Sequence, residues 1–465
     1  MRFTFLERVM LVVGLCQMIA PTNGLASDNR IRKDPYSYST KSNIWGRGGN
    51  DKSRRVGGLS SALSSSPPPY PCRVAVMGGG NFGIALATIC ARKGMPTTLL
   101  VRSEEVAQAI NTTHRHPSKM SDIELPSTLR ATSKPEECLP DATFIVHAVP
   151  VQYSRSFLEK VAKHIPPNTP VLSGSKGIET TSLGFMADIL KQTLGEDRPY
   201  AFLSGPSFAR EICEGSATAV VIASEDLLLA RDLAELVSDG SFRAFTTRDV
   251  MGVEIGGAVK NVIALAAGMC EGLGLGTNAM SGLVTRGCGE MRRLGNVFGA
   301  RPSTIGGLSG MFSGNQRQAM LLFLDDVMLC CRYDPNDPCV DHVSTLGVGD
   351  TFGTCFGPLS RNRKFGYRLG KGETMEEILA STTEVAEGVE TSKALVNLIR
   401  TKCKGYRLDL KFPILFGIAQ ILEGELTPED GLKGIMSMPF IMENFDERYT
   451  PMTSRDYAEA EEITN

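Results

Sequence analysis

A short glycine-rich loop constrains the fold of this chain more than any other sequence feature. Residues 74–77, Val-Ala-Val-Met, have the apolar character of a buried strand, and residues 78–83, Gly-Gly-Gly-Asn-Phe-Gly, follow directly. The stretch 84–92 is helical in character and stops before Gly94. Between a strand and a helix, a G-x-G-x-x-G loop gives a tight turn and lets a pyrophosphate approach the helix N-terminus. The loop therefore predicts a dinucleotide-binding site at Gly78, Gly80 and Gly83.

Strands and helices alternate after this loop. Apolar strands are expected at 97–101, 143–149, 171–173, 201–203 and 218–223, with helices such as 153–164 and 183–194 between several of them. This alternation predicts a doubly wound parallel α/β sheet of Rossmann type. Ligands of such sheets bind beyond the carboxyl ends of the strands, where residues 150–153, 175–177 and 204–209 fall. After about residue 245 helical periodicity takes over, so an all-helical domain should follow.

Arg102 follows the second expected strand, where the ribose of a dinucleotide is recognised. NAD-selective sites usually place Asp or Glu there to bond the 2′-hydroxyl, whereas an arginine tolerates the 2′-phosphate of NADP. Arg102 could equally be a solvated strand end. The expected cofactor is accordingly NAD or NADP, and the residue alone leaves both open.

A lysine falls inside an apolar run in the helical part. Residues 253–267 predict a buried helix, and Lys260 lies among its apolar residues. An unpaired buried charge is costly, so this lysine should have either a partner or a lowered pKa. A desolvated lysine suits proton transfer to or from a substrate oxygen, and Gly256 and Gly257 would let a ligand or backbone approach. The alternative is a lysine whose charged end reaches solvent at the helix edge.

Two polar segments lie further along the chain. Residues 350–355 contain Asp350 and Thr354, and residues 360–366 read Ser-Arg-Asn-Arg-Lys-Phe-Gly. Arginine and asparagine on a loop can form a phosphate fork, because a guanidinium binds phosphate oxygens bidentately. Taken alone, the basic cluster could also be a solvated turn.

Four passages together resemble the NAD(P)-dependent glycerol-3-phosphate dehydrogenase family. They are residues 78–83, Ser-Gly-Pro-Ser-Phe-Ala at 204–209, Gly-Gly-Ala-Val-Lys-Asn-Val-Ile-Ala at 256–264, and residues 360–366. The similarity spans roughly residues 72–445. It implies an N-terminal Rossmann domain, an all-helical C-terminal domain and a site between them. The implied reaction is reversible hydride transfer between NAD(P)H and dihydroxyacetone phosphate, which gives sn-glycerol 3-phosphate for glycerolipid synthesis.

The resemblance also implies roles for single residues. Lys260 matches the catalytic lysine that protonates the ketone oxygen, Lys176 a lysine near substrate and cofactor, and Asp350 a carboxylate that orients the site. Implied substrate contacts are Lys176, Gly205, Ser207, Lys260, Asp350, Thr354, Ser360, Arg361 and Asn362. Implied cofactor contacts are Gly78, Gly80, Asn81, Phe82, Gly83, Arg102, Tyr153, Lys176, Ala209, Arg361, Val385 and Glu387. No metal is expected, and none of the five histidines lies in these motifs.

The first 71 residues are predicted to be a targeting sequence and not part of a folded domain. Arg2 and Arg8 precede the apolar stretch 9–20, and small residues follow, so residues 1–26 are expected to be a signal peptide. Residues 27–71 are Ser- and Arg-rich and poor in acids, as in a disordered transit-like leader. The two together resemble the bipartite leader of proteins sent to plastids acquired by secondary endosymbiosis. Plain secretion is the alternative.

The rest of the chain divides into two expected domains and a tail. A dinucleotide-binding domain should span 72–248, a helical substrate domain 249–450, and a tail 451–465. Residues 311–347 interrupt a glycine-rich turn that is continuous in the family, between Gly310 and Val348. This insertion is either a surface loop or translated intron sequence.

Composition limits the partners. The net charge of −2 argues against nucleic acid, and no apolar run reaches the roughly 20 residues that a membrane span needs. The twelve cysteines are scattered without a C-x-x-C and are expected to be reduced. The expected partners are a small phosphorylated substrate and a second copy of the chain in a homodimer. Alternative functions are a β-hydroxyacid dehydrogenase and a dinucleotide-binding protein that the insertion has inactivated.

Overall fold

The computed structural model describes residues 72–301, 304, 349–382, 386–405 and 407–437. The expected signal peptide, leader, insertion and tail lie outside these residues, as does Val385. All eight cysteines in the described part are free thiols.

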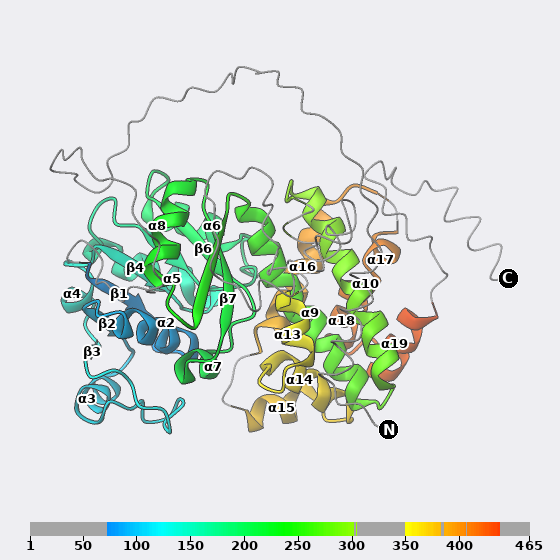
Figure 1. Ribbon diagram of the computed structural model, residues 1–465. Helices are drawn as coiled ribbons and strands as arrows, with labels where there is room; N and C mark the ends of the chain where they lie inside the picture. The colour runs from blue at the N-terminus through cyan, green and yellow to red at the C-terminus, as the bar shows by residue number, and fades with distance from the viewer. Residues whose placement is uncertain (1–71, 302–303, 305–348, 383–385, 406, 438–465) are drawn as a thin grey trace, which may run out of the picture. The chain divides into compact units, whose positions relative to one another are not determined.

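An eight-stranded sheet forms the N-terminal part of the described chain (Figure 1). The strand order is β3-β2-β1-β4-β5-β6-β7-β8. The strands are β1 (Val74–Met77), β2 (Thr97–Leu100), β3 (Leu129–Thr132), β4 (Phe144–His147), β5 (Val171–Ser173), β6 (Tyr200–Ser204), β7 (Thr218–Ala223) and β8 (Phe242–Thr247). The expected α/β class is confirmed. The order reverses at β1, which pairs with both β2 and β4 and so places the glycine loop at the switch point where such sheets bind ligands.

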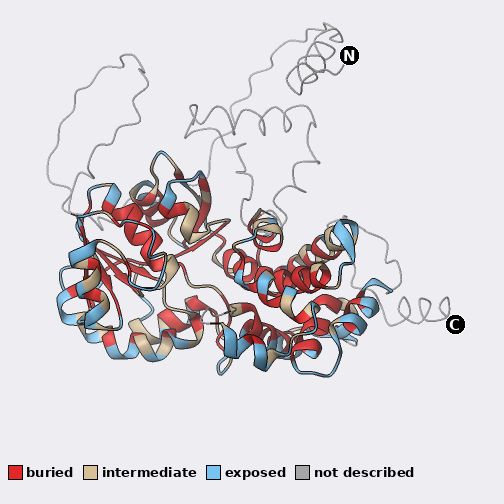
Figure 2. Cartoon of the chain, turned by 90° about the horizontal axis from the view of Figure 1, so that it is seen from below, coloured by how far each residue is buried: buried red, intermediate tan, exposed pale blue. Residues whose placement is uncertain are grey.

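Helices cover both faces of the sheet. They are α2 (Asn81–Arg92), α3 (Glu104–Thr113), α4 (Pro135–Cys138), α5 (Val151–Val161), η1 (Ala162–His164), α6 (Met186–Leu194), α7 (Ala209–Glu214) and α8 (Leu227–Val237). Side chains alternate along β1: Val76 joins one apolar core with α2 and α8, and Met77 joins the other with α5 and α6. Figure 2 shows the buried sheet and the exposed outward faces of the helices around it.

One pairing in the sheet is antiparallel. All other neighbours are parallel, but β7 runs opposite to β6. Strand β7 thus enters the sheet at the edge where β6 ends, and the short helix α7 can make this connection. A parallel neighbour would have required the chain to cross back over the sheet. The residues between β6 and β7 therefore stay at the carboxyl edge of β6.

The C-terminal part of the described chain is helical. Its helices are α9 (Val250–Gly272), α10 (Gly276–Val297), α13 (Asp350–Phe356), α14 (Arg361–Gly370), α15 (Met375–Ser381), α16 (Glu387–Lys402), α17 (Leu408–Lys411), α18 (Pro413–Leu422) and α19 (Pro428–Met436). Helix α9 contacts α10, α13, α14, α16 and α18, so it is the core of this part (Figure 1). By length and composition α9 alone among the described helices could cross a membrane, but 83% of its apolar window is buried in the protein.

Glycines bring α9 and α14 into backbone contact. A Cβ atom on Gly268 of α9 would lie 2.0 Å from the carbonyl oxygen of Arg363, and one on Gly366 of α14 would lie 2.0 Å from that of Leu265. Real Cβ atoms do not approach so closely, so any larger residue would push the helices apart. This crossing fixes the N-terminus of α14 relative to the middle of α9, where Lys260 lies.

Candidate active site

Asp350 is the centre of a buried ion cluster. It is the first residue of α13, and its side chain is 2% exposed. One carboxylate oxygen, Oδ1, accepts a short hydrogen bond from Nζ of Lys260 on α9. The same Nζ lies 3.1 Å from the hydroxyl of Thr354, one turn after Asp350 on α13. The buried lysine that the sequence predicted therefore has a partner from ninety residues further along the chain.

The other carboxylate oxygen faces the carboxyl edge of the sheet. Oδ2 of Asp350 lies 3.3 Å from Nζ of Lys176, in the loop after β5, and accepts a hydrogen bond from the backbone N–H of Gly205 (3.1 Å). The hydroxyl of Ser204, the last residue of β6, donates to the same oxygen over 3.2 Å. Asp350 thus joins the helical part to the sheet, and both lysines share its charge.

The electrostatics of the cluster follow from burial. Removal from water lowers the pKa of Lys260 to about 8, although the charge of Asp350 opposes this shift. Burial alone would raise the pKa of Asp350, but the two ammonium groups outweigh burial and hold the pKa below its ordinary value. An amine with a pKa near 8 can both release and take up a proton near neutral pH.

A cavity opens beside the cluster. Its volume is about 50 Å³, and its lining includes Lys176, Lys260, Thr354 and the 205–208 segment. Within that segment Ser207 donates its hydroxyl to the carbonyl of Gly205 over 2.9 Å. Gly205 has a φ of +146°, and a Cβ there would lie 2.8 Å from Val220, so only glycine allows this turn. The structure brings together the predicted residues Lys176, Gly205, Ser207, Lys260, Asp350 and Thr354.

The predicted phosphate fork lies at the N-terminus of α14. Ser360 caps this helix by accepting the N–H of Arg363. The side-chain oxygen of Asn362 accepts the N–H of Gly388 at 2.9 Å, next to Glu387 at the start of α16. A Cβ on Gly388 would lie 2.7 Å from the carbonyl of Asn261, the residue after Lys260. The N-terminus of α14 is therefore held close to Asn261 on α9, and Arg361 is exposed beside it.

The glycine loop fits a dinucleotide. Gly78 has a φ of +113°, and a Cβ on Gly83 would lie 1.9 Å from the carbonyl of Gly78. No atom lies within 4 Å of the position of a Cβ on Gly80, so a ligand can approach that backbone. Gly80 caps α2 without a side-chain hydrogen bond. Next to it, the buried side-chain oxygen of Asn81 has no partner in the described chain. The backbone N–H groups at this helix N-terminus can donate to a phosphate, whereas the Asn81 oxygen can only accept a hydrogen bond, for example from a hydroxyl group.

The remaining cofactor candidates lie along the same edge of the sheet. Nζ of Lys176 lies 5.8 Å from the ring centre of Phe82, which places the glycine loop beside the ion cluster. Tyr153, on the first turn of α5, is 54% exposed, and Ala209 begins α7. Arg102 is exposed and has no hydrogen bond or ion pair within the described residues. The structure does not join Arg102 or Tyr153 to the ion cluster.

Sequence reasoning missed the contact of Ser204. It belongs to the 204–209 motif, in which roles are expected only for Gly205, Ser207 and Ala209. The signal was its place as the last residue of a buried strand at the ligand edge. No group of three or more His, Cys, Asp or Glu side chains that could hold a metal occurs among the described residues.

The fold and the site define a class. A Rossmann-type sheet with a phosphate-ready glycine loop, joined to a helical part that supplies a buried lysine, is the architecture of a nicotinamide-dinucleotide-dependent dehydrogenase. Comparison with family models then gives the particular family. Residues 73–230 match the N-terminus of NAD-dependent glycerol-3-phosphate dehydrogenase, and residues 249–313 and 339–433 match its C-terminus. The chain belongs to this family, and part of the expected insertion, 314–338, stays outside the match.

Individual relatives agree with this assignment. A chloroplastic glycerol-3-phosphate dehydrogenase (NAD+) of Arabidopsis thaliana is 40% identical over 80% of this chain and 79% of its own length. A glycerol-3-phosphate dehydrogenase (NAD(P)+) of Oleidesulfovibrio alaskensis is 39% identical over 78% of this chain and 98% of its own. The crystal structure of glycerol-3-phosphate dehydrogenase from Coxiella burnetii aligns with a TM-score of 0.65 at 27% identity, over 79% of this chain and 99% of that one.

Proposed function

We propose that this protein is an sn-glycerol-3-phosphate dehydrogenase that reduces dihydroxyacetone phosphate with NADH or NADPH. The observation that carries the proposal is the pair Lys260 and Lys176 on one buried carboxylate, at a cavity beside the glycine loop. Family membership supplies the substrate class, and the cavity lies where a ligand bound at the carboxyl edge of the sheet would reach it.

The reaction needs a hydride and a proton. A nicotinamide dinucleotide, held by the glycine loop at Gly78, Gly80 and Gly83, would supply the hydride. Lys260 supplies the proton to the carbonyl oxygen, because it lines the cavity and burial lowers the pKa of its ammonium to about 8. Asp350 holds that ammonium by Oδ1 while Thr354 fixes its direction. In the reverse reaction the neutral amine of Lys260 takes the proton from the alcohol.

Lys176 and the phosphate fork at residues 360–362 have separate roles in the proposed reaction. Lys176 lies between Asp350 and the ring of Phe82, so its charge can stabilise negative charge that develops on the substrate oxygen. Ser360, Arg361 and Asn362 would bind the phosphate, with Arg361 free to bond it bidentately. The Ser360–Arg361–Asn362 cluster at the N-terminus of α14 favours a phosphorylated substrate over the carboxylate of a β-hydroxyacid.

The choice of cofactor depends on Arg102. Its exposed guanidinium at the end of β2 can contact a 2′-phosphate, and no acidic residue occupies that position to select the 2′-hydroxyl. We therefore expect turnover with both NADH and NADPH.

Location and assembly complete the proposal. The leader 1–71 would direct the chain to a plastid, in agreement with the chloroplastic names of plant relatives. Fusion of residues 1–71 to a fluorescent protein should give plastid fluorescence, and secretion of the fusion would contradict this. We further propose a homodimer, for which light scattering after size-exclusion chromatography should give twice the chain mass.

Steady-state assays test the activity. The purified full chain should oxidise NADH and NADPH when dihydroxyacetone phosphate is added. A folded protein that binds NADH yet gives only the rate of the enzyme-free blank would be the inactive binding protein instead. The same assay with β-hydroxyacids and their keto forms tests the alternative activity. A higher kcat/KM on those substrates than on dihydroxyacetone phosphate would identify a β-hydroxyacid dehydrogenase instead.

A further inference from the structure

Glu254 is a buried carboxyl that the proposed reaction does not use. It lies on α9, six residues before Lys260, and it is 9% exposed. Its Oε1 accepts the N–H of Ala187 over 2.9 Å, at the N-terminus of α6. Its Oε2 is buried and has no hydrogen-bond partner within the described residues. Half of this carboxyl therefore has a structural partner, and the other half has none.

A second buried carboxyl shows what a purely structural role looks like. Glu290 on α10 is 0% exposed and caps α18. One of its oxygens accepts the N–H of Ile414 and the other that of Leu415. Both oxygens of Glu290 are thus satisfied by one helix N-terminus. Glu254 could cap α6 in the same way, but one of its oxygens is directed elsewhere.

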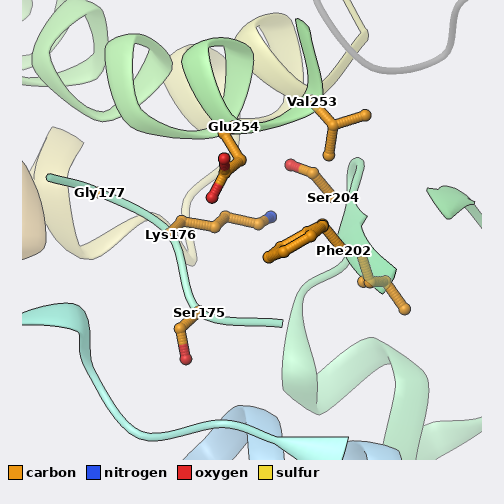
Figure 3. Close-up of a pocket in the computed structure, with 8 residues that line it drawn as sticks. Ser175, Lys176, Gly177, Phe202, Ser204, Val253 and Glu254 are labelled. Carbon is orange, nitrogen blue, oxygen red and sulfur yellow. The ribbon is translucent and has the colours of Figure 1, made fainter. Parts of the chain in front are cut away.

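The side chain of Glu254 lines a cavity next to the ion cluster. The cavity is lined by Ser175, Lys176, Gly177, Phe202, Ser204, Glu254 and their neighbours, and its volume of about 10 Å³ suits one water molecule. Figure 3 shows the Glu254 carboxyl, the Ser204 hydroxyl and the Lys176 side chain directed into this space. The hydroxyl of Ser204 already donates to Asp350, so it can accept a hydrogen bond from the cavity side.

We propose that Glu254 positions Ser204 through one water molecule held in this cavity and, through Ser204, the carboxylate of Asp350 that pairs with Lys176. The proposal rests on the proposed function, since its target is the arrangement around Asp350. The protonated carboxyl donates to the water, the water donates to Ser204, and Ser204 donates to Oδ2 of Asp350. Each group in this chain then has a defined donor or acceptor role, and the direction of Asp350 toward both lysines is fixed.

The surroundings favour the neutral form. Burial raises the pKa of Glu254 to about 8, and the nearby Asp188 of α6 adds to this. The backbone N–H groups of Ala187 and Met186 oppose the shift, and so does the charge of Lys191. Lys191 is paired with Glu225 on the surface, and Lys176 with Asp350. Ionised Glu254 would compete with Asp350 for the ammonium of Lys176. Loss of its proton should therefore disturb the site.

Two substitutions in the full-length protein separate positioning from packing. Glu254→Gln keeps the size, a donor and an acceptor, but cannot ionise. Glu254→Ala removes the contact with the cavity. We expect Glu254→Gln to keep kcat/KM for dihydroxyacetone phosphate within about twofold at pH 7. We expect Glu254→Ala to lose about tenfold in kcat, with KM for NADH unchanged, because small displacements of catalytic groups are costly.

The alkaline limb of the pH profile is the decisive readout. In the wild type, burial raises the pKa of Glu254 and lowers that of Lys260, so both groups are expected to lose protons on the alkaline side of neutrality, and log kcat/KM for reduction should fall with a slope steeper than one. In Glu254→Gln only Lys260 titrates, and the slope should be one. Glu290→Gln, the matched control, should lower thermal stability while leaving the wild-type slope.

Each contrary result would overturn the proposal. The first is a slope of log kcat/KM in Glu254→Gln equal to that of the wild type. The second is an equal loss of kcat in the glutamine and alanine variants. The third is a wild-type kcat for folded Glu254→Ala. If the alanine variant does not fold, the slope of the glutamine variant decides alone. An inactive wild type would instead contradict the proposed function, so the two failures are distinguishable.

Discussion

Lys260 carries the largest expected effect of any single side chain. Lys260→Ala removes the proposed proton donor and leaves Asp350 buried with only Lys176 as a cationic partner. We expect kcat to fall at least about 10²-fold, which is the usual range for a general acid. Steady-state kinetics at saturating substrate measure this, with the exposed Lys160→Ala as a control for loss of a positive charge. Near-normal turnover would make Lys260 a structural residue.

The lowered pKa of Lys260 gives opposite pH profiles in the two directions. Reduction needs the ammonium, so its rate should fall as pH rises through about 8. Oxidation of glycerol 3-phosphate needs the neutral amine, so its rate should rise through the same range. We expect these opposite profiles in initial rates measured in both directions between pH 6 and pH 10, at steps of roughly half a pH unit. Parallel profiles would assign the proton transfer to another group.

Arg361 should act on substrate binding. Arg361→Ala removes a charge-assisted contact to phosphate, which is worth about 1.5–3 kcal/mol, so KM should rise roughly 10- to 100-fold with a smaller change in kcat. Lys364→Ala, an exposed cation on the same helix, is the matched control and should leave KM near the wild-type value. Equal increases in both variants would indicate only a general effect of charge.

The environment of Lys260 could be predicted from the sequence, because a buried charge is stable only with a partner or a shifted pKa. The apolar run around Lys260 implied a partner or a lowered pKa, and the structure has both. The identity of that partner could not be derived from burial, since Asp350 is remote in sequence. The contact of Ser204 and the free oxygen of Glu254 depend on how β6, α6 and α9 meet, and no local pattern encodes that meeting.

The crossing of α9 and α14 yields a prediction at the scale of elements. Gly268→Ala would place a methyl carbon 2.0 Å from the Arg363 carbonyl oxygen, far inside van der Waals contact, so the helices must separate. Overpacking of this kind costs about 3 kcal/mol, and displacement of α14 should also raise KM by moving the phosphate fork. Urea unfolding measures the loss of stability, which should lower the midpoint while the m value stays unchanged. Steady-state kinetics measure the change in KM.

Gly282→Ala is the matched control for that crossing. This glycine lies in α10 with no atom within 4 Å of a Cβ position. Alanine should stabilise the helix there by about 0.5–1 kcal/mol, through helix propensity alone. If both alanine variants had the same stability, close approach of the backbones would not be what selects glycine at position 268.

Among the elements, the expected strands and helices of the sheet region agree with the structure to within a few residues, but β3 and β8 were not predicted. Strand β3 reads Leu-Arg-Ala-Thr, has an exposed arginine and is an edge strand of four residues. Strand β8 is the opposite edge and is only partly buried after Phe242. Edge strands need less apolar surface than central ones, so hydrophobic pattern detects them poorly.

The insertion matters for the whole molecule. Removal of residues 311–347 would join Gly310 to Val348 in a glycine-rich turn before Asp350. Closure of the longer loop costs little, about 0.6 kcal/mol per doubling, but the apolar segment 320–331 invites aggregation. The deletion variant should be at least as active and more soluble, by steady-state rates and sedimentation. A folded but inactive deletion variant would place the segment in the active site.

The face of α9 that meets the sheet carries three functions one turn apart. Glu254 binds α6, Gly257 lies against Ser204 and Lys176, and Lys260 binds Asp350. A residue added or lost between Glu254 and Lys260 would rotate one function away from the others by about 100°. The spacing of these three residues is therefore under a joint geometric constraint. One face of α9 determines both how the sheet and the helical part join and where the ammonium of Lys260 stands.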